Sequence, residues 1–260
     1  MITLLTDFGA QDYFVGAMKG VILSANPSAL VVDLTHDISP QDVHAAAFNL
    51  LACYKDFPSG TIHVAVVDPG VGSARRPLLI ECAGQFFVGP DNGLFSWICE
   101  REKSFVARQL TAEKFFRQPT SRTFHGRDVF APVAAALSNA VAPEEFGPVV
   151  DNLVLLESLS PKVRADGALE GALIHIDRFG NCISNFISDH LQSADGNPKL
   201  IVNGRAITSV RQIFSDSKDV DELFMIVGSA GFVEIAARNS SAAVILKAQR
   251  GQKALLFQGF

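Results

Sequence analysis

The sequence predicts two domains: an α/β domain with a mostly parallel sheet flanked by helices, then a smaller all-β, barrel-like domain. Three observations predict this architecture. In the first half, short apolar runs alternate with segments of helical spacing, which is typical of a parallel sheet covered by helices. Ser-Pro and polar residues then form a linker at 155–167. Beyond the linker the helical period nearly vanishes, and short strands between turns favour a barrel or sandwich. We expect domains at 1–160 and 168–260.

Turn and cap signals separate the expected elements of the first domain. The first helix stops at Asn26-Pro27, and the last, an Ala-rich helix, has Pro132 in its first turn, where proline is tolerated. We expect strands at 2–5, 30–34, 61–67, 77–82 and 85–88, and helices at 13–24, 42–54 and 128–137. In the second domain we expect only strands, at 172–176, 182–186, 199–202, 222–227, 232–237, 243–247 and 254–257.

The composition excludes several classes of protein. A chain of 260 residues can bury one large core or two modest ones, and 48% hydrophobic with 19% charged residues is typical of a globular protein. The net charge of -5, without a basic run, predicts no nucleic-acid partner. The apolar start meets Asp7 at once, so we expect no signal sequence, no membrane attachment and a cytoplasmic location. The four cysteines are scattered, so neither a disulfide framework nor structural zinc is expected.

The segment from Asp68 to Arg76 is the most informative part of the chain. An apolar strand ends at Asp-Pro-Gly, and paired arginines follow within a few residues. A carboxylate at the carboxyl end of a strand lies where α/β folds usually bind ligands. An arginine folded back beside Asp68 would form a fixed charge pair that could order a small polar reactant. A simple turn followed by two solvated arginines explains the same residues, and this stretch alone leaves both interpretations open.

Other polar residues also follow strands or precede helices. Asp128, at a helix start, is expected to be a cap or a first-turn acid. His125 lies in a loop between an aromatic residue and a glycine, and its pKa range suits proton handling, although a lone loop histidine is usually only solvated. A metal site is conceivable, but its candidate ligands lack the spacing of strong metal motifs, so we expect no metal. Those candidate ligands are Asp7, His36, Asp37, Asp68 and His125.

Two turns of the second domain have both a structural and a functional interpretation. The segment 177–181 is expected to be a hairpin turn in which Gly180 and Asn181 take positive φ angles. Alternatively, Phe179 stacks on a base while the Asn181 carboxamide pairs with its edge. The segment 228–232 is a second such turn, whose amides and Ser229 hydroxyl could hold a carboxylate. Neither the phosphate-binding P-loop nor the G-x-S-x-G motif of hydrolases is present.

Six ordered motifs together resemble the S-adenosylmethionine hydrolase (adenosine-forming) family, relatives of fluorinase and chlorinase. The motifs are Thr6-Asp7-Phe8-Gly9, Asp68-Pro69-Gly70-Val71-Gly72 with Arg75-Arg76, Pro90-Asp91-Asn92-Gly93, Thr123-Phe124-His125-Gly126-Arg127-Asp128, Asp177-Arg178-Phe179-Gly180-Asn181 and Gly228-Ser229. The resemblance implies attack of an activated water or hydroxide on ribose C5′ of S-adenosylmethionine, which releases adenosine and L-methionine. It implies no metal and no cofactor other than this substrate.

The resemblance also assigns roles to individual residues. The family's catalytic triad falls on Asp68, Arg75 and His125. The resemblance further implies a homotrimer with each site between the first domain of one subunit and the second domain of its neighbour. The expected substrate-binding residues are Asp7 for the ribose hydroxyls, Asn181 and Phe179 for adenine, Asp12, Asp177 and Ser229 for the amino-acid end, and Phe124. The alignment around Arg238 is ambiguous, so its role stays open.

Two alternatives to a hydrolase remain at this point. A halogenase is disfavoured, because those relatives carry a Tyr-Pro-Ala-Thr-Gly-like segment in place of 68–72 and a serine in place of Gly126. Those differences remove hydroxyls that contact the halide and introduce Asp68, an anion that would repel it. The long fluorinase insertion after this segment is also missing. A protein that binds S-adenosylmethionine or adenosine without turnover would keep Asp7, Asp177 and Asn181 but would not need the triad.

Overall fold

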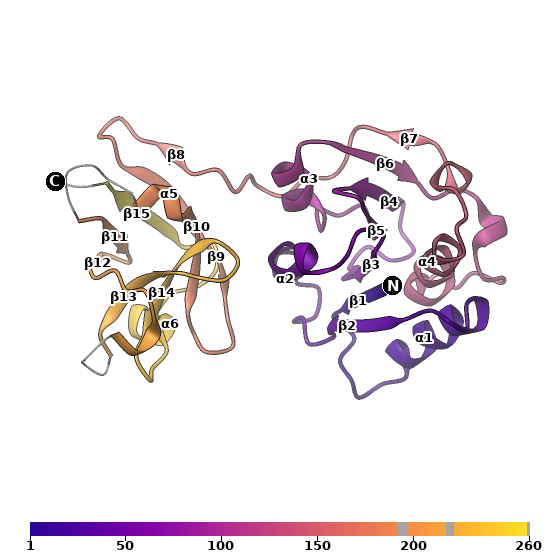
Figure 1. The fold of residues 1–260 in the computed structure, drawn as a ribbon, viewed down its shortest axis with the longest axis horizontal. Helices are drawn as coiled ribbons and strands as arrows, with labels where there is room; N and C mark the ends of the chain where they lie inside the picture. Colours follow the sequence, from indigo (N-terminus) through magenta and orange to yellow (C-terminus); the bar gives the residue numbers. More distant parts are fainter. Residues whose placement is uncertain (192–196, 217–220, 259–260) are drawn as a thin grey trace. The chain divides into compact units, whose positions relative to one another are not determined.

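A computed structural model describes residues 1–191, 197–216 and 221–258, and the chain divides into two compact units (Figure 1). The units are Met1–Ser158 and Leu159–Phe260, so their boundary falls inside the linker expected at 155–167. Each unit has its own hydrophobic core. Among the described residues, no helix is long and apolar enough to cross a membrane.

The first unit contains a seven-stranded sheet in the order β2-β1-β3-β5-β4-β6-β7. The four neighbouring strands β2, β1, β3 and β5 are parallel to one another. Strands β4, β6 and β7 extend the sheet beyond β5 by antiparallel pairs. The α/β class is therefore confirmed, with a sheet that is mixed rather than parallel throughout. The strands are β1 (Ile2–Thr6), β2 (Val31–Thr35), β3 (Ile62–Val66), β4 (Pro77–Cys82), β5 (Gln85–Pro90), β6 (Phe105–Gln109) and β7 (Val149–Val150).

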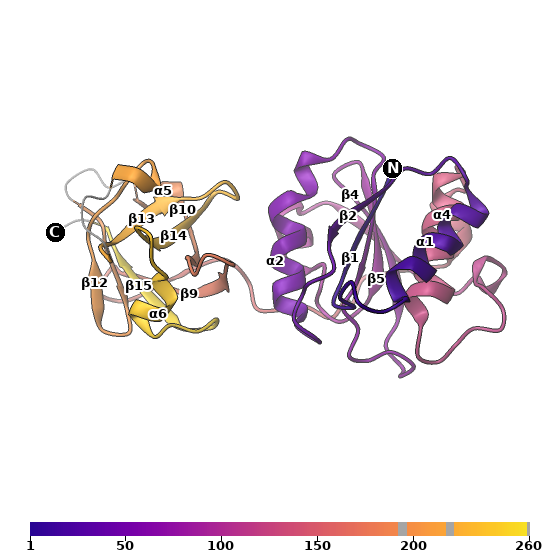
Figure 2. The ribbon, with the colours of Figure 1, turned by 90° about the horizontal axis from the view of Figure 1, so that it is seen from below.

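Helices cover both faces of this sheet. Figure 2 shows α1 (Phe14–Ala25) and α4 (Ala131–Ser138) on one face and α2 (Val43–Cys53) on the other. Met18 and Ile22 of α1 are buried against the small residues of α4, which allow a close helix approach. The Ala-rich composition of α4 therefore reflects packing. The proline of α4 lies in its first turn, as expected.

Several elements of this unit, β7 among them, were not expected from the sequence. The helix expected at 128–137 begins instead with a π-helical turn, Gly126–Phe130, before α4. The short helix α3 (Ser96–Glu102) and strand β6 carry mixed polar and apolar residues without a clear period. Sequence periodicity alone was therefore too weak to predict them.

The second unit is an antiparallel, nearly closed sheet, which confirms the barrel-like prediction. Its path runs β12-β11-β15-β9-β10-β14-β13, and β8 pairs with β9. A bridge between Val210 and Met225 joins the chain just after β12 to β13, the two ends of this path. The strands are β8 (Lys162–Val163), β9 (Leu169–Ile176), β10 (Cys182–Ile187), β11 (Lys199–Val202), β12 (Arg205–Ile207), β13 (Leu223–Val227), β14 (Phe232–Ala237) and β15 (Lys253–Phe257).

The strand expected at 243–247 is wrong, because this segment is the helix α6 (Ala242–Leu246). Ser241 caps it by accepting a hydrogen bond from the Val244 amide at 3.2 Å, and Lys247 ends it in the left-handed conformation. A short apolar run cannot by itself distinguish a strand from a helix. The short helix α5 (Ser188–Leu191), the linker strand β8 and strand β12 were also not expected.

Candidate active site

The carboxyl ends of the parallel strands bring predicted polar residues to one edge of the sheet. Strands β1 and β3 are parallel neighbours in which Thr6 pairs with Val66, so Asp7 and Asp68 follow adjacent strand ends. From the next strand, Asn92 Nδ2 donates a hydrogen bond to the Val67 carbonyl at 2.8 Å and fixes the chain just before Asp68. This edge is where α/β folds place ligands.

Asp68, Arg75 and His125 form one hydrogen-bonded cluster. Arg75 Nε lies 3.0 Å from both carboxylate oxygens of Asp68, and Nη2 donates to Oδ2 of the same group. The same Nη2 donates to His125 Nδ1 at 2.7 Å. The side chains of Arg75 and Asp68 are only 9% and 5% exposed, so this charge pair is shielded from water. The structure thus brings together the three residues that the resemblance singled out.

The contact with Arg75 determines the protonation of His125. A guanidinium has only donors, so Nδ1 must accept and the hydrogen of the neutral ring lies on Nε2. Burial, followed by the positive charge of Arg75, lowers the pKa of His125 below its ordinary value of 6.5. The imidazole is therefore neutral at pH 7 and presents Nε2–H as a donor.

The surrounding chain leaves this cluster little freedom. The Arg75 guanidinium carbon lies 5.4 Å from the Phe130 ring centre, a cation–π contact. Gly72 has a φ of +76°, and a Cβ there would come within 2.4 Å of the Arg122 carbonyl oxygen. Only glycine fits at this position, where the 68–75 loop packs against the segment that leads to His125.

Asp128 stabilises the segment that carries His125. Its fully buried carboxylate accepts the Ser121 amide at 2.8 Å and is paired with Arg127, whose Nε lies 2.7 Å away. Asp128 lies in the first turn of the π-helical segment, which confirms the prediction of a first-turn acid. These bonds hold the pKa of Asp128 below its ordinary value despite its burial, which acts in the opposite direction.

Arg76 follows Arg75 directly but contacts different residues and has a structural role. Its Nε donates to Asp91 at 2.8 Å, and its Nη1 donates to Asn152 at 2.8 Å. The Asp91 side chain is only 3% exposed and also accepts the Val154 amide at 2.9 Å. Arg76 is therefore neither solvated nor part of the cluster, and it ties the strand-end loop to 152–154.

The other predicted residues of the first unit differ in exposure. Asp7 accepts the Gln41 amide at 2.8 Å through Oδ2. Phe124 is buried, with its ring edge-on to Phe14 at a centroid distance of 5.3 Å, so it packs in the core beside the site. Asp12 is exposed. The structure thus gives Asp7 and Phe124 defined local contacts next to the strand ends.

His36 holds the loop that carries Asp7, a link that the sequence did not reveal. Its Nδ1 lies 2.9 Å from Thr6 Oγ1, and its Nε2 lies 3.0 Å from Asp33. Its carbonyl accepts the Gly9 amide at 2.9 Å. Thr6 ends β1, Asp33 lies in the middle of β2 and His36 directly follows β2, so only the sheet register could have predicted these contacts.

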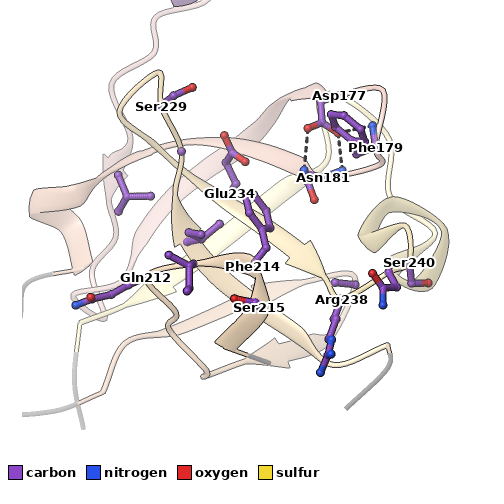
Figure 3. A pocket seen from close by; sticks show the side chains of 16 residues that line it. Asp177, Phe179, Asn181, Gln212, Phe214, Ser215, Ser229, Glu234, Arg238 and Ser240 are labelled. Atoms are coloured by element: carbon purple, nitrogen blue, oxygen red, sulfur yellow. Dashed lines mark hydrogen bonds between the residues drawn. The ribbon is translucent and has the colours of Figure 1, made fainter. Parts of the chain in front are cut away.

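The second unit carries a pocket of about 1110 Å³ (Figure 3). It is lined by four of the predicted residues, Asp177, Phe179, Asn181 and Ser229. Asp177 Oδ1 accepts the amides of Phe179 and Asn181, and its Oδ2 accepts the Asn181 carboxamide at 2.8 Å. Phe179 is 79% exposed, and Ser229 is exposed as well. The turn is a hairpin, but only Gly180 takes a positive φ, because Asn181 is fixed by Asp177.

Several further residues line this pocket. Arg238, whose role stayed open at the sequence level, is one of them. They lie in β14, directly after β14 and in the chain before β13, and these segments become adjacent only through the barrel pairing, so no local motif could have identified them. The others with polar or aromatic side chains are Gln212, Phe214, Ser215, Glu234, Asn239 and Ser240.

Metal ligands and reactive thiols are not features of the described residues. Among 1–191, 197–216 and 221–258, no three histidine, cysteine or acidic side chains lie close enough together to hold a metal ion. All four cysteines are free. Burial raises the pKa of Cys53, Cys82 and Cys182 to about 11 and that of Cys99 to about 12, so these thiols stay protonated at neutral pH.

Fold and site together define a two-domain protein in which an α/β unit carries a buried Asp–Arg–His cluster and a barrel-like unit carries a polar pocket. Family models match both units. The model described as the SAM hydroxide adenosyltransferase N-terminal domain matches residues 2–147, and the corresponding C-terminal domain matches residues 171–254. The chain belongs to the SAM hydroxide adenosyltransferase family.

Individual relatives agree with this family. A Methanocaldococcus jannaschii protein named (R)-S-adenosyl-L-methionine hydrolase is 35% identical over 95% of this chain and 91% of its own length. An uncharacterised conserved protein from Thermotoga maritima, known as a crystal structure, is 32% identical with a TM-score of 0.90 over 99% of this chain and 100% of its own. A fluorinase from Actinoplanes is more distant, at 24% identity over 93% of this chain and 91% of its own length.

Proposed function

We propose that this protein hydrolyses S-adenosyl-L-methionine to adenosine and L-methionine. The Asp68–Arg75–His125 cluster at the carboxyl end of β3 carries this proposal, because it offers a buried, mutually hydrogen-bonded arrangement of charges for one small nucleophile. The activity named for the 35%-identical relative supports the same reaction. Cleavage breaks the C5′–S bond and forms a C5′–O bond. The electron pair goes to sulfur, which leaves as a neutral thioether.

The difficult part of this reaction is the nucleophile. Bulk water has a pKa of about 15.7, so a water molecule must be held in line with the C–S bond and gain hydroxide character. The Arg75 guanidinium supplies a fixed positive charge that stabilises the developing negative charge. Asp68 holds Arg75 in place and accepts a hydrogen bond from the water. Holding water in an attacking geometry lowers the barrier by several kcal/mol.

His125 acts by positioning the water in this mechanism. Its Nδ1 is occupied by Arg75, so its Nε2–H donates to the water oxygen and cannot at the same time take the water's proton. The proton leaves through Asp68 or to solvent. A neutral leaving group needs no general acid, so we propose that the reaction uses no metal or redox cofactor.

The remaining predicted residues are proposed to bind the substrate. Asp7 keeps an oxygen for the ribose hydroxyls, because the Gln41 amide contacts only Oδ2. Asn181 donates one amide hydrogen to Asp177 and retains its carbonyl oxygen and second hydrogen for an adenine edge. The exposed ring of Phe179 is available for stacking. Asp12, Asp177 and Ser229 are proposed for the amino-acid end, and Phe124 for the wall beside the ribose.

Two observations disfavour a halogenase. The Asp68 carboxylate occupies the strand end and would repel a halide. Gly126 has no room for a larger residue without adjustment, since a Cβ there would lie 3.1 Å from Met18 Sδ and 3.4 Å from the Phe124 ring. A binding protein without turnover is the second alternative, and it leaves the buried cluster without a purpose.

We further propose that the active form is a homotrimer with sites between subunits, in the cytoplasm and with no nucleic-acid partner. The separation of the cluster and the pocket into different units supports a composite site, as do the exposed apolar residues that line the pocket, Phe179, Ile213 and Phe214. Light scattering measures the mass. At substrate concentrations below KM, mixed trimers of Asp68→Ala and Asn181→Ala subunits should be more active than the same amounts of the two variants assayed separately, and no gain on mixing would contradict the composite site.

The hydrolase proposal is tested by incubating the protein with the separate (R) and (S) sulfonium epimers in ¹⁸O-labelled water, with and without chloride or fluoride. We expect equal amounts of adenosine and methionine, with the label in the 5′-hydroxyl of adenosine. Unlabelled adenosine would contradict attack at C5′. A halogenated nucleoside would support the halogenase, and binding without any adenosine would support the binding protein.

A further inference from the structure

Glu234 is a carboxylate that lines the pocket of the second unit. It lies in β14 opposite Ile226 of β13, and its side chain is partly buried. Among the described residues, no hydrogen bond or ion pair engages its carboxylate. In the view of Figure 3 it stands between the turn with Ser229 and the turn with Asp177 and Asn181. A half-buried carboxylate is costly unless a donor satisfies it.

The neighbouring backbone is shaped around this carboxylate. A Cβ built on Gly228 would lie 1.7 Å from Glu234 Oε1 and 2.4 Å from its carboxyl carbon. The carboxylate therefore rests directly against the glycine backbone, in space that any other residue would fill. Gly228 does not have a positive φ, so the contact with Glu234 explains this glycine better than backbone conformation does.

Asp177, the other acid of the pocket, is already engaged. Its two oxygens accept three hydrogen bonds from the turn that they close. Asp177 therefore fixes the Asn181 carboxamide and keeps only part of its acceptor capacity for the amino-acid end proposed above, whereas the acceptor capacity of Glu234 is not used by the described residues. A cationic ligand group with several N–H donors is the natural partner for Glu234.

We propose that Glu234 binds the α-ammonium group of the substrate's amino-acid end and so determines specificity for an amino-acid sulfonium. This inference rests on the proposed function and extends it, because Glu234 is not among the residues that the family resemblance assigned. The Gly228–Ser229 turn beside it offers amides and a hydroxyl for the α-carboxylate. The two charged groups of an α-amino acid would then contact neighbouring parts of one wall.

The electrostatics of the empty pocket agree with this assignment. Burial, and next the negative charge of Asp177, raises the pKa of Glu234 above its ordinary value of 4.5. An ammonium group would counter both effects, since it supplies donors and a positive charge.

The test compares two sulfonium substrates that share the scissile C5′–S bond. S-adenosylmethionine carries the α-amino acid, whereas 5′-deoxy-5′-(dimethylsulfonio)adenosine lacks it. For Glu234→Gln we expect KM for S-adenosylmethionine to rise about tenfold to a hundredfold, with kcat within about threefold. KM for the dimethyl analogue should stay within about twofold.

Gly228→Ala disturbs the same carboxylate through the backbone against which it rests. The added methyl group meets the flexible end of Glu234, so it should displace the carboxylate without unfolding the sheet, and KM should rise in the same selective way. Glu170→Gln, at a carboxylate outside the pocket that pairs with Lys253, is the matched control and should change neither KM. Unchanged KM for S-adenosylmethionine in both pocket variants, or an equal rise for both substrates, would overturn the inference.

Calorimetry separates this inference from the hydrolase proposal. In the presence of adenosine, the wild-type protein should bind L-methionine more tightly than 4-(methylsulfanyl)butanoate, which lacks the amino group, and Glu234→Gln should abolish the difference. If neither sulfonium yields adenosine, the hydrolase proposal fails, and this binding preference then decides the inference. Equal binding of the two ligands by the wild type would overturn it.

Discussion

The cluster of the first unit and the pocket of the second solve different electrostatic problems. Asp68, Arg75 and His125 satisfy one another through a bidentate contact and a shared guanidinium nitrogen, so their geometry is set before any ligand arrives. In the pocket, Glu234 has no hydrogen-bond or ion-pair partner among the described residues, and Phe179 is 79% exposed, so both groups are available to a ligand. The cluster therefore holds preorganised charges, which suit catalysis, whereas the pocket holds unsatisfied groups, which suit recognition of a ligand. Changes in the first region should therefore lower kcat, and changes in the second should raise KM.

The largest expected effect is that of Arg75→Lys. A lysine keeps the positive charge but cannot reproduce the planar fork that reaches both Asp68 and His125. We expect kcat to fall about 100-fold to 1000-fold, with KM within about threefold, as measured by steady-state release of adenosine. An equal loss in kcat and in substrate affinity would mean that Arg75 binds substrate and does not serve the reacting water.

Arg76→Leu is the neighbouring control, and its effect should be on stability. It leaves the Asp91 carboxylate, which is 3% exposed, without its cation. Losing one partner of a buried pair should lower the free energy of unfolding by about 3 kcal/mol, measured by urea denaturation. The folded fraction should keep kcat within about threefold of the wild type. A collapse of kcat in well-folded protein would place Arg76 in the catalytic cluster.

Changes in the pocket turn should have a smaller and different effect. For Phe179→Ala or Asn181→Ala we expect KM to rise about tenfold with little change in kcat, because stacking and edge contacts with the base are lost. Val244→Ala, an exposed apolar residue outside the pocket lining, is the control. A selective loss of kcat in Phe179→Ala would break the division between the two regions.

The smallest expected effect is the dependence of kcat on pH, which tests the role of His125 in the cluster. Protonation of His125 would place a hydrogen on Nδ1 and break its bond from Arg75, so the neutral ring is the active form. Burial and Arg75 lower the pKa of His125 below 6.5, so at pH 6.5 kcat should exceed half of its plateau value. Activity should then fall as pH decreases through that lowered pKa. A midpoint above 6.5 would contradict the geometry.

Local sequence patterns predicted most of the fold. Strands such as β4 and β14 were predicted with the bounds that the structure has, since apolar runs between clear turn signals leave little choice. The segment at 243–247 failed for the opposite reason. Its five residues are compatible with either a strand or a helix. The Ser241 cap and the surrounding barrel stabilise the helix α6.

The site was predictable to the extent that its residues lie in contiguous motifs. Asp68 and Arg75 are seven positions apart on one turn, so a charge pair between them could be expected from the sequence. Local chemistry alone did not distinguish Arg75 from Arg76, and only the family resemblance selected Arg75, because their different partners, His125 and Asp91, come from distant parts of the chain. Glu234 stood in an ordinary strand pattern and gave no local signal.

The sequence by itself determined the two-domain class, the strand-end chemistry and the resemblance to a family, because these depend on local propensity and on motifs of a few residues. Only the tertiary structure decided that Arg76 pairs with Asp91, which nitrogen of His125 accepts a hydrogen bond, and which carboxylate of the pocket lacks a partner among the described residues. These properties depend on hydrogen-bond geometry and burial between segments far apart in the chain. No sequence spacing encodes them directly.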